Sequence, residues 1–188
     1  MRDLPRLRTP RLCLRPWRKS DLPLFAAINA DPRVMEFFVS TMTAAETDAL
    51  IARYREHWRT RGYGMCAVDL KRPAGEAPEF IGYIGLARVR YEIDFTPVVE
   101  VGWRLAPHVW GQGLATEGAK AALAYGFDTL GLDEIIAFTA TTNVRSRRVM
   151  DKIGMTHDPR DDFYHPNIRE GHPLRRQVLY RTRRLAAH

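Results

Sequence analysis

The amino-acid sequence predicts an α+β domain in which strands and helices share one hydrophobic core. Segments with apolar residues at every second position alternate with segments whose apolar residues follow helical spacing and begin at capping residues. Hydrophobic residues make up 45% of the 188 residues, which is enough for a sizeable core. Neither an internal repeat nor a long linker divides the sequence, so we expect one domain over residues 1–188.

Apolar periodicity and turn residues set the boundaries of the expected elements. Capping residues mark the helices: Ser20 is an N-cap candidate, Thr43 and Glu46 form a capping-box pattern, and Gly62 and Gly154 end helices. A polar hairpin rich in proline and glycine separates the second strand from the third. We expect strands over residues 11–15, 63–70, 80–89, 97–105, 134–140 and 174–183. We expect helices over residues 20–30, 31–37, 43–61, 112–130 and 144–153.

The strand expected over residues 97–105 runs into a short glycine turn that precedes a helix of small residues. Gly111 and Gly113 allow a tight turn and a close approach of backbone to a ligand. The free N–H groups and positive dipole end of a helix N-terminus suit a phosphate. The strand's faces alternate, with Val101, Trp103 and Leu105 on one side and Glu100, Gly102 and Arg104 on the other.

Two familiar phosphate-binding motifs fit this turn poorly. A P-loop requires a Lys-Ser/Thr pair after its last glycine, whereas Leu114 and Ala115 stand there. A dinucleotide fingerprint requires a third small residue where the sequence has Thr116. Nucleotide hydrolysis is therefore not expected. The alternative to phosphate binding is a tight strand-to-helix turn without a ligand.

Composition excludes several other classes of protein. No apolar run approaches the length of a membrane-spanning helix, and the N-terminus lacks the apolar stretch of a secretory signal. Two cysteines are too few for a disulfide scaffold, so we expect a cytoplasmic protein. The six histidines show no metal-ligand spacing, and no metal is expected. The net charge of +7 fits a solvated basic surface or docking on an acidic partner such as the ribosome, but no nucleic-acid-binding motif accompanies it.

An ordered series of motifs resembles the GCN5-related N-acetyltransferase (GNAT) superfamily, and most closely its branch of Rim-type ribosomal-protein alanine acetyltransferases. The resemblance runs from about residue 8 to residue 183, and the order and spacing of the motifs are its strongest feature. At the glycine turn Trp110 departs from the superfamily's Arg/Gln. The motifs lie at residues 9–16, 100–107, 110–117, 142–146 and 151–155.

The resemblance implies a fold, a cosubstrate and a set of binding residues. The fold is an αβα sandwich around a mixed, mostly antiparallel sheet, in which two splayed strands form a coenzyme A cleft. The cosubstrate is acetyl-CoA, whose pyrophosphate the glycine turn holds and whose pantetheine arm pairs with the strand edge before it. The implied coenzyme-binding residues are Trp103, Leu105, Trp110, Gly111, Gln112, Gly113, Leu114, Ala115, Thr116, Asn143 and Ser146.

Candidate catalytic residues follow from the same correspondence. Glu100 is the expected base that deprotonates the amine through water, and the alternative is an ordinary strand-edge carboxylate. Ser146 is expected to serve the leaving thiolate, with helix capping as the alternative, and Tyr164 is a second candidate for that role. Asn143 either contacts the pantetheine arm or caps the same helix. Where the branch walls off its acceptor pocket, the sequence has Met35, Glu36, Phe37 and Phe38. The alternative for this mostly apolar run is a place in the core, with Glu36 as the exception, because its carboxylate suits a cationic amine.

Three functions remain open at this point. The leading one is acetyl transfer from acetyl-CoA to a protein N-terminal α-amine, as in ribosomal-protein acetylation. The second transfers the acetyl group to a small amine such as an antibiotic or a polyamine. The third is a non-catalytic module that binds acyl-CoA or nucleic acid. The oligomeric state stays open, with a homodimer among the alternatives.

Overall fold

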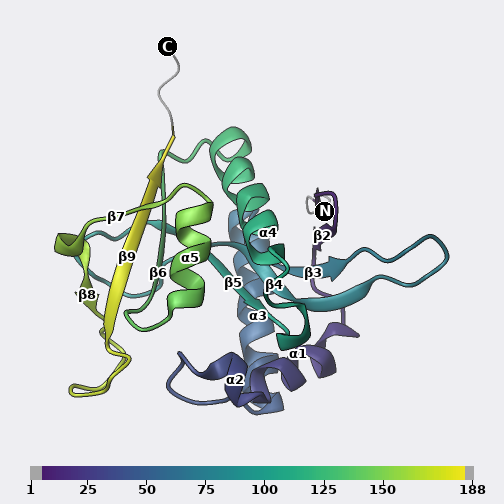
Figure 1. Cartoon of the computed structure of the whole chain (residues 1–188), viewed down its shortest axis with the longest axis horizontal. Helices are drawn as coiled ribbons and strands as arrows, with labels where there is room; N and C mark the ends of the chain where they lie inside the picture. Colours follow the sequence, from purple (N-terminus) through teal and green to yellow (C-terminus); the bar gives the residue numbers. More distant parts are fainter. Residues whose placement is uncertain (1–5, 185–188) are drawn as a thin grey trace.

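The structure is a computed structural model that describes residues 6–184 as a sheet with helices on both faces (Figure 1). The strands are β1 (Leu7–Arg8), β2 (Leu12–Arg15), β3 (Met65–Leu70), β4 (Glu79–Arg88), β5 (Val99–Leu105), β6 (Glu134–Ala140), β7 (Thr156–His157), β8 (Phe163–Tyr164) and β9 (Arg176–Arg183). The helices are α1 (Asp21–Ala30), α2 (Pro32–Met35), α3 (Ala44–Arg61), α4 (Leu114–Ala124) and α5 (Val144–Lys152). Shorter helical turns are Pro107–Val109 and Pro159–Asp161 (3-10) and Tyr125–Thr129 (π).

The strands form one mixed sheet in the order β1-β2-β3-β4-β5-β6-β9-β7, and β8 also pairs with β9. Every pairing is antiparallel except that of β5 with β6, which is parallel. Helices α4 and α5 lie in front of the strands in Figure 1, and α3 lies behind them. The predicted sandwich and its mostly antiparallel sheet are therefore confirmed.

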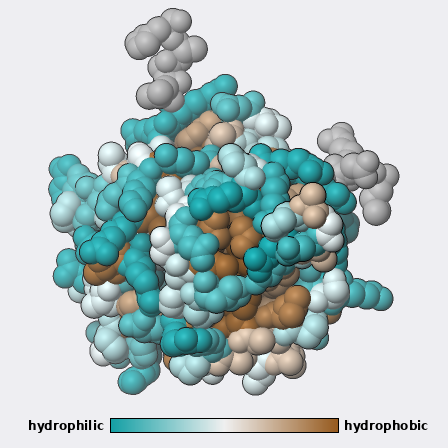
Figure 2. All heavy atoms as spheres, turned by 45° about the vertical axis from the view of Figure 1, so that its right-hand side comes forward, coloured by the Kyte–Doolittle hydropathy of each residue, from teal (hydrophilic) through white to brown (hydrophobic). Residues whose placement is uncertain are grey.

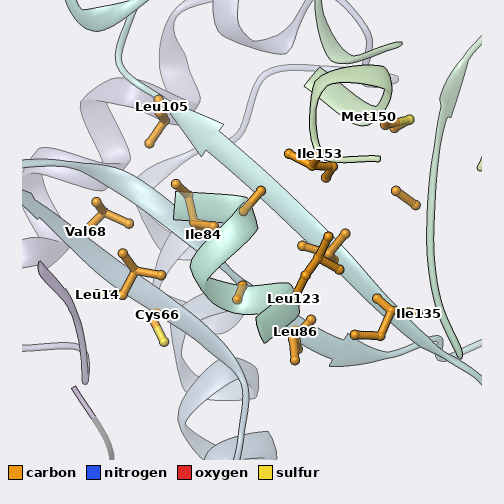
Figure 3. Packing of buried hydrophobic residues seen from close by; sticks show 14 of the residues in the cluster. Leu14, Cys66, Val68, Ile84, Leu86, Leu105, Leu123, Ile135, Met150 and Ile153 are labelled. Atoms are coloured by element: carbon orange, nitrogen blue, oxygen red, sulfur yellow. The ribbon is translucent and has the colours of Figure 1, made fainter. Parts of the chain in front are cut away.

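Apolar side chains form a separate core on each face of the sheet. On the α4 face, leucine and isoleucine side chains from the strands pack beneath α4 and α5 (Figure 3). Gly118 allows the close approach, since a Cβ there would collide with Ile84. On the opposite face, Trp17 and Phe25 pack with Ile51 of α3. Hydrophilic residues cover most of the surface in Figure 2, and apolar residues reach it in patches at its centre and lower part. No α-helix within residues 6–184 has the length and hydropathy that a membrane-spanning helix needs.

Local signals in the sequence predicted most boundaries, and the exceptions have physical reasons. The capping box at Thr43 and Glu46 is present, and Gly62 ends α3 with φ 77°. Ser20 is at the N-cap position of α1 as predicted, but its backbone already has helical angles (φ −63°, ψ −19°) and its side chain makes no cap hydrogen bond. The Asp21 carboxylate instead accepts a hydrogen bond from the Arg18 N–H at 2.7 Å.

The other differences concern short or irregular elements. The helix expected over residues 112–130 begins at Leu114, and its α-helical part ends at Ala124, where a π-helical turn follows. Strands β1, β7 and β8 have two residues each, too few to show a period in the sequence.

A buried ion cluster joins β2 to β3 and α1. The Arg15 guanidinium is 3% exposed and donates to both Asp69 and Asp21, with Nε to Asp69 Oδ2 at 2.6 Å and Nη1 to Asp21 Oδ2 at 2.7 Å. Paired forks of this kind are the strongest geometry for a buried arginine. Removing one carboxylate would leave part of a buried charge without a partner.

We expect Asp69→Asn to lower the free energy of unfolding by about 1–3 kcal/mol, because it weakens two charge-assisted hydrogen bonds of buried Arg15 while Asp21 still neutralises the guanidinium. Urea denaturation followed by circular dichroism measures the change. Glu56→Gln, which breaks an ion pair to the exposed Arg59, is the control and should change stability little. An equal effect of the two substitutions would show that the buried cluster contributes no special stability.

Candidate active site

The sheet opens between β5 and β6 in the middle of the molecule. The two strands are paired in parallel at only two positions, Val99 with Ile135 and Glu100 with Ile136, and they separate after Glu100. β4 pairs with β5 along its whole length, so the freed edge of β5 faces β6. The Ala106 N–H donates to Ile81 O on the β4 side at 2.9 Å. Because backbone groups alternate along a strand, the N–H groups of Trp103 and Leu105 face the open edge.

A cleft of about 1270 Å³ occupies this opening. Its walls come from β4, β5 and β6, from α3 on one side and from the start of α4 and the exposed face of α5 on the other. Residues 165–168, which follow β8, close one end. The cleft therefore passes through the sheet and connects its two helical faces.

The glycine turn lies at one end of the cleft. Gly111 and Gly113 have φ of 75° and 77°, in the left-handed region that side chains with a Cβ rarely adopt. Gly113 is the N-cap of α4, and the first amide with a partner within the helix is that of Glu117, which donates to Gly113 O at 3.0 Å. The preceding amides of the first turn are thus free for a ligand. Of the residues predicted to bind here, Gly111, Gly113, Leu114, Ala115 and Thr116 line the cleft and Gln112 does not.

The turn is held in place by an interaction that the sequence analysis missed. Arg11 donates from Nη1 to Gln112 O at 2.9 Å and from Nε to Glu117 Oε2 at 2.6 Å. Glu117 Oε1 also accepts from the Thr9 hydroxyl at 2.6 Å and from the Arg11 N–H at 2.8 Å. The β1–β2 hairpin is thereby joined to the first turn of α4. No local pattern reveals this contact, because 106 residues separate Arg11 from Glu117.

Asn143 and Ser146 lie together at the start of α5, on the cleft wall. Asn143 is the N-cap, and its Oδ1 accepts from the Ser146 N–H at 3.2 Å. Its Nδ2 donates to Thr139 Oγ1 at 2.9 Å and to Ser146 Oγ at 3.1 Å. Since Ser146 Oγ already accepts a hydrogen bond, its own proton is free to be donated elsewhere. Asn143 therefore both caps the helix and orients the serine.

Trp110 and Arg145 contact each other on the cleft wall near the glycine turn. Trp110 donates from Nε1 to Leu105 O at 2.8 Å, so its ring is fixed against the end of β5. The guanidinium carbon of Arg145 lies 4.4 Å from the centre of that ring. Arg145 also pairs with Glu36 at 2.6 Å, which joins α5 to the segment after α2. This pair bridges the two sides of the cleft.

The four residues predicted to wall the acceptor pocket have different positions. Met35 is 4% exposed in the core and does not line the cleft, because it is on the buried side of α2. Glu36 is outside the lining as well, since its carboxylate pairs with Arg145. Phe37 and Phe38 do line the cleft.

Glu100 faces the cleft from β5, just where β5 and β6 part. Burial raises the pKa of its carboxyl to about 7, because the charged form loses solvation. Tyr54 of α3 and Tyr91 also line this region, and burial raises the pKa of each phenol. The sequence analysis missed both tyrosines, since an aromatic residue on a helix face, such as Tyr54, is also typical of a core, and Tyr91 is in the irregular segment between β4 and β5.

Other candidates lie away from the chemistry. Tyr164 is 63% exposed, contacts Arg175 and does not line the cleft. Cys66 is 3% exposed, and burial raises the pKa of its thiol to about 12, which disfavours the reactive thiolate. Within residues 6–184, no cluster of three or more histidine, cysteine or acidic side chains is arranged to hold a metal ion.

Comparison with known proteins gives the family. The model of the acetyltransferase (GNAT) domain matches residues 11–156. The FsC-acetyl coenzyme A-N(2)-transacetylase of Aspergillus fumigatus is 33% identical over 161 residues, which are 81% of this chain and 66% of that protein. An acetyltransferase from Agrobacterium tumefaciens superposes with a TM-score of 0.75 at 29% identity, over 97% of this chain and 96% of that one.

A more distant structure bears on the predicted Rim-type branch. RimL, a ribosomal L7/L12 alpha-N-protein acetyltransferase solved in complex with coenzyme A, has a TM-score of 0.73 over 95% of this chain and 98% of its own. Its identity of 14% shows a shared fold alone, so the narrower branch stays a prediction from sequence. The wider family is shown by the domain model and the closer relatives: the chain belongs to the GNAT family and is an acetyl-CoA-dependent N-acetyltransferase.

Proposed function

We propose that this enzyme acetylates a primary amine that reaches the cleft from the α3 side while acetyl-CoA enters from the α4 side. The observation that carries the proposal is the open edge of β5, which begins at Glu100 and ends close to the glycine turn. The thioester, the catalytic base and the phosphate site would then all lie along β5 and the glycine turn that follows it. The amine would attack the acetyl carbonyl carbon directly, without an enzyme nucleophile.

The glycine turn and the β5 edge are the proposed coenzyme site. The amides around Gly111 to Thr116 would hold the pyrophosphate, helped by the dipole of α4. The pantetheine arm, which resembles a short peptide, would pair with the backbone N–H groups of Trp103 and Leu105 at the open edge. Arg148 and Lys152 of α5 also line the cleft and add positive charge to it. Bound acetyl-CoA supplies the activated acyl group.

Three groups would then act on the acetyl transfer. The Leu105 N–H is placed to donate to the carbonyl oxygen as negative charge develops there. Glu100 would take the amine proton, directly or through water, and its raised pKa makes it a stronger base than an exposed carboxylate. As the carbon–sulfur bond breaks, the Ser146 hydroxyl would donate to the leaving thiolate, since its Oγ accepts from Asn143.

The acceptor favoured by this geometry is a small primary amine. The sequence resemblance favours a protein N-terminal α-amine, but that inference depends on the Rim-type branch. The acceptor side is walled by buried Tyr83 and Arg104 and by Phe38, which suits a compact ligand. A cytoplasmic location, ribosome association and a homodimer are further proposals from sequence alone.

Release of free coenzyme A thiol from acetyl-CoA tests this function. We expect small primary amines to accelerate thiol release strongly and N-terminal peptides of ribosomal proteins to do so weakly. Acceleration by peptides alone would favour the protein N-terminal acceptor. A chain that binds acetyl-CoA but releases no thiol with any amine would be the non-catalytic module.

Gly113→Val should weaken coenzyme A binding by about tenfold or more, because a branched Cβ at φ 77° distorts the turn that presents the amides. Isothermal titration calorimetry with coenzyme A measures the change. Gly62→Val is a matched control, since Gly62 also has φ 77° but ends α3 outside the cleft lining. Equal affinity in wild type and Gly113→Val would remove the glycine turn from the coenzyme site.

The value of kcat/KM should rise with pH through about 7, because the Glu100 carboxyl must lose its proton before it can act as base. We expect Glu100→Gln to lower kcat/KM by about 10²–10⁴-fold and to abolish this limb. An amine with a pKa above about 9 keeps its own titration separate and serves as the internal control. If the limb near pH 7 survives in Glu100→Gln, another group is the base.

A further inference from the structure

Arg104 is a buried cation that has no carboxylate partner among the residues that the structure describes. It is 7% exposed and lines the cleft from β5. Its Nη1 donates to Asn29 Oδ1 at 2.6 Å and lies 3.7 Å from the sulfur of Met42. Its Nε is buried without a hydrogen-bond partner, and within residues 6–184 no carboxylate lies within 4.0 Å of it. A buried charge of this kind is costly unless something pairs with it.

The same chain shows how it satisfies a buried arginine that has only a structural role. Arg15, 3% exposed, has the carboxylates of Asp21 and Asp69 on both sides of its guanidinium. Arg104 has an amide oxygen and the rings of Phe38 and Tyr83, whose centres lie 4.1 and 5.6 Å from its guanidinium carbon. Aromatic faces attract the cation but do not neutralise it. The missing partner is an anion.

The coenzyme is not that anion, because Arg104 is on the other face of the sheet from the phosphate site. Val101 and Leu105 belong to the core beneath α4, whereas Arg104 contacts Asn29 of α1 and lies beside Phe25 and Tyr83. The glycine turn leads into α4 on the opposite face. An anion that reaches Arg104 must therefore come with the acceptor.

The charges around the acceptor side agree with this conclusion. Arg53 of α3 and Arg88 and Arg90 at the end of β4 line the same cleft. Its acidic lining residues, within the part of the chain that the structure describes, are Glu56 and Glu100, and Glu56 pairs with Arg59. A polycation such as a polyamine would meet net repulsion here, while an anionic ligand is attracted.

We propose that the acceptor amine carries an oxyanion, a carboxylate or phosphonate, that Arg104 binds as a two-pronged donor. This inference rests on the proposed function and narrows its substrate class to amino acids and related amino acid-like metabolites. Arg104 is then a specificity-determining residue, and Phe38 and Tyr83 enclose the pair against water. The guanidinium fork matches an oxyanion in a way that an ammonium group does not.

Matched pairs of acceptors test the proposal on the wild-type enzyme. The two members of each pair differ only by the carboxylate: phenylalanine and phenethylamine, methionine and 3-(methylthio)propylamine, histidine and histamine. Each acceptor is assayed by thiol release at one pH, and its concentration is expressed as that of the deprotonated amine. We expect kcat/KM to be at least about tenfold higher for the amino acid of the preferred pair. Equal or higher values for the decarboxylated amines would overturn the inference while leaving the proposed function standing. Absence of thiol release with every amine would overturn both.

Substitution at Arg104 tests the residue itself. Arg104→Gln should raise KM for the preferred amino acid by at least about tenfold and leave KM for its decarboxylated partner nearly unchanged. Arg104→Lys, which keeps the charge without the fork, should recover part of the loss. Arg55→Gln, on α3 but outside the cleft lining, should change neither value. An equal rise in KM for both members of the pair would mean that Arg104 has a structural role and would overturn the assignment. If Arg104→Gln does not fold, the comparison of matched acceptors on the wild-type enzyme decides whether the acceptor carries an oxyanion.

Discussion

The early separation of β5 from β6 is the constraint on which the rest of the site depends. A parallel pair that continued beyond Glu100 and Ile136 would use the backbone groups of β5 within the sheet and leave no edge for a ligand. Each strand is held on its far side, β5 by β4 and β6 by β9, through antiparallel pairing along its length. The opening is therefore built between two rigid half-sheets and does not require a mobile segment.

The two faces of β5 divide the chemistry of the cleft. On one face Val101 and Leu105 pack beneath α4, so the strand and the helix that follows the glycine turn share one core. On the other face Glu100 and Arg104 project into the acceptor side with Gly102 between them. A Cβ at Gly102 would lie 3.0 Å from Met65 Cε, so the glycine leaves space in the cleft between the two charged side chains.

Sequence patterns predicted the features that depend on neighbours in the chain. The capping box at Thr43, the glycine turn and the alternation along β5 are all local, and each is present in the structure. The contacts that fix the site join distant segments. Arg11 reaches Glu117 across 106 residues and Arg104 reaches Asn29 across 75, so neither pairing has a local signature.

Burial and side-chain partners distinguish structural residues from candidate site residues that look alike in the sequence. Arg15 and Arg104 are both arginines in strands with apolar neighbours. Only the tertiary structure shows that Arg15 pairs with two carboxylates, whereas Arg104 pairs with none in the described part of the chain. Met35 and Phe38 belong to the same apolar run, yet the first is in the core and the second lies over Arg104. A helical turn of four residues is too short for periodicity to assign its faces.

The charges of Glu100 and Arg104 do not neutralise each other, although both lie on one face of one strand. Four residues of extended chain place their Cα atoms about 13 Å apart. A guanidinium close to Glu100 would lower the pKa of its carboxyl, whereas burial raises it to about 7. The cleft thus holds a separated acid and cation, each desolvated before any acceptor binds. An α-amino acid whose carboxylate binds Arg104 would hold its amine on the Glu100 side of the cleft, and a water molecule would carry the proton across the remaining distance to Glu100.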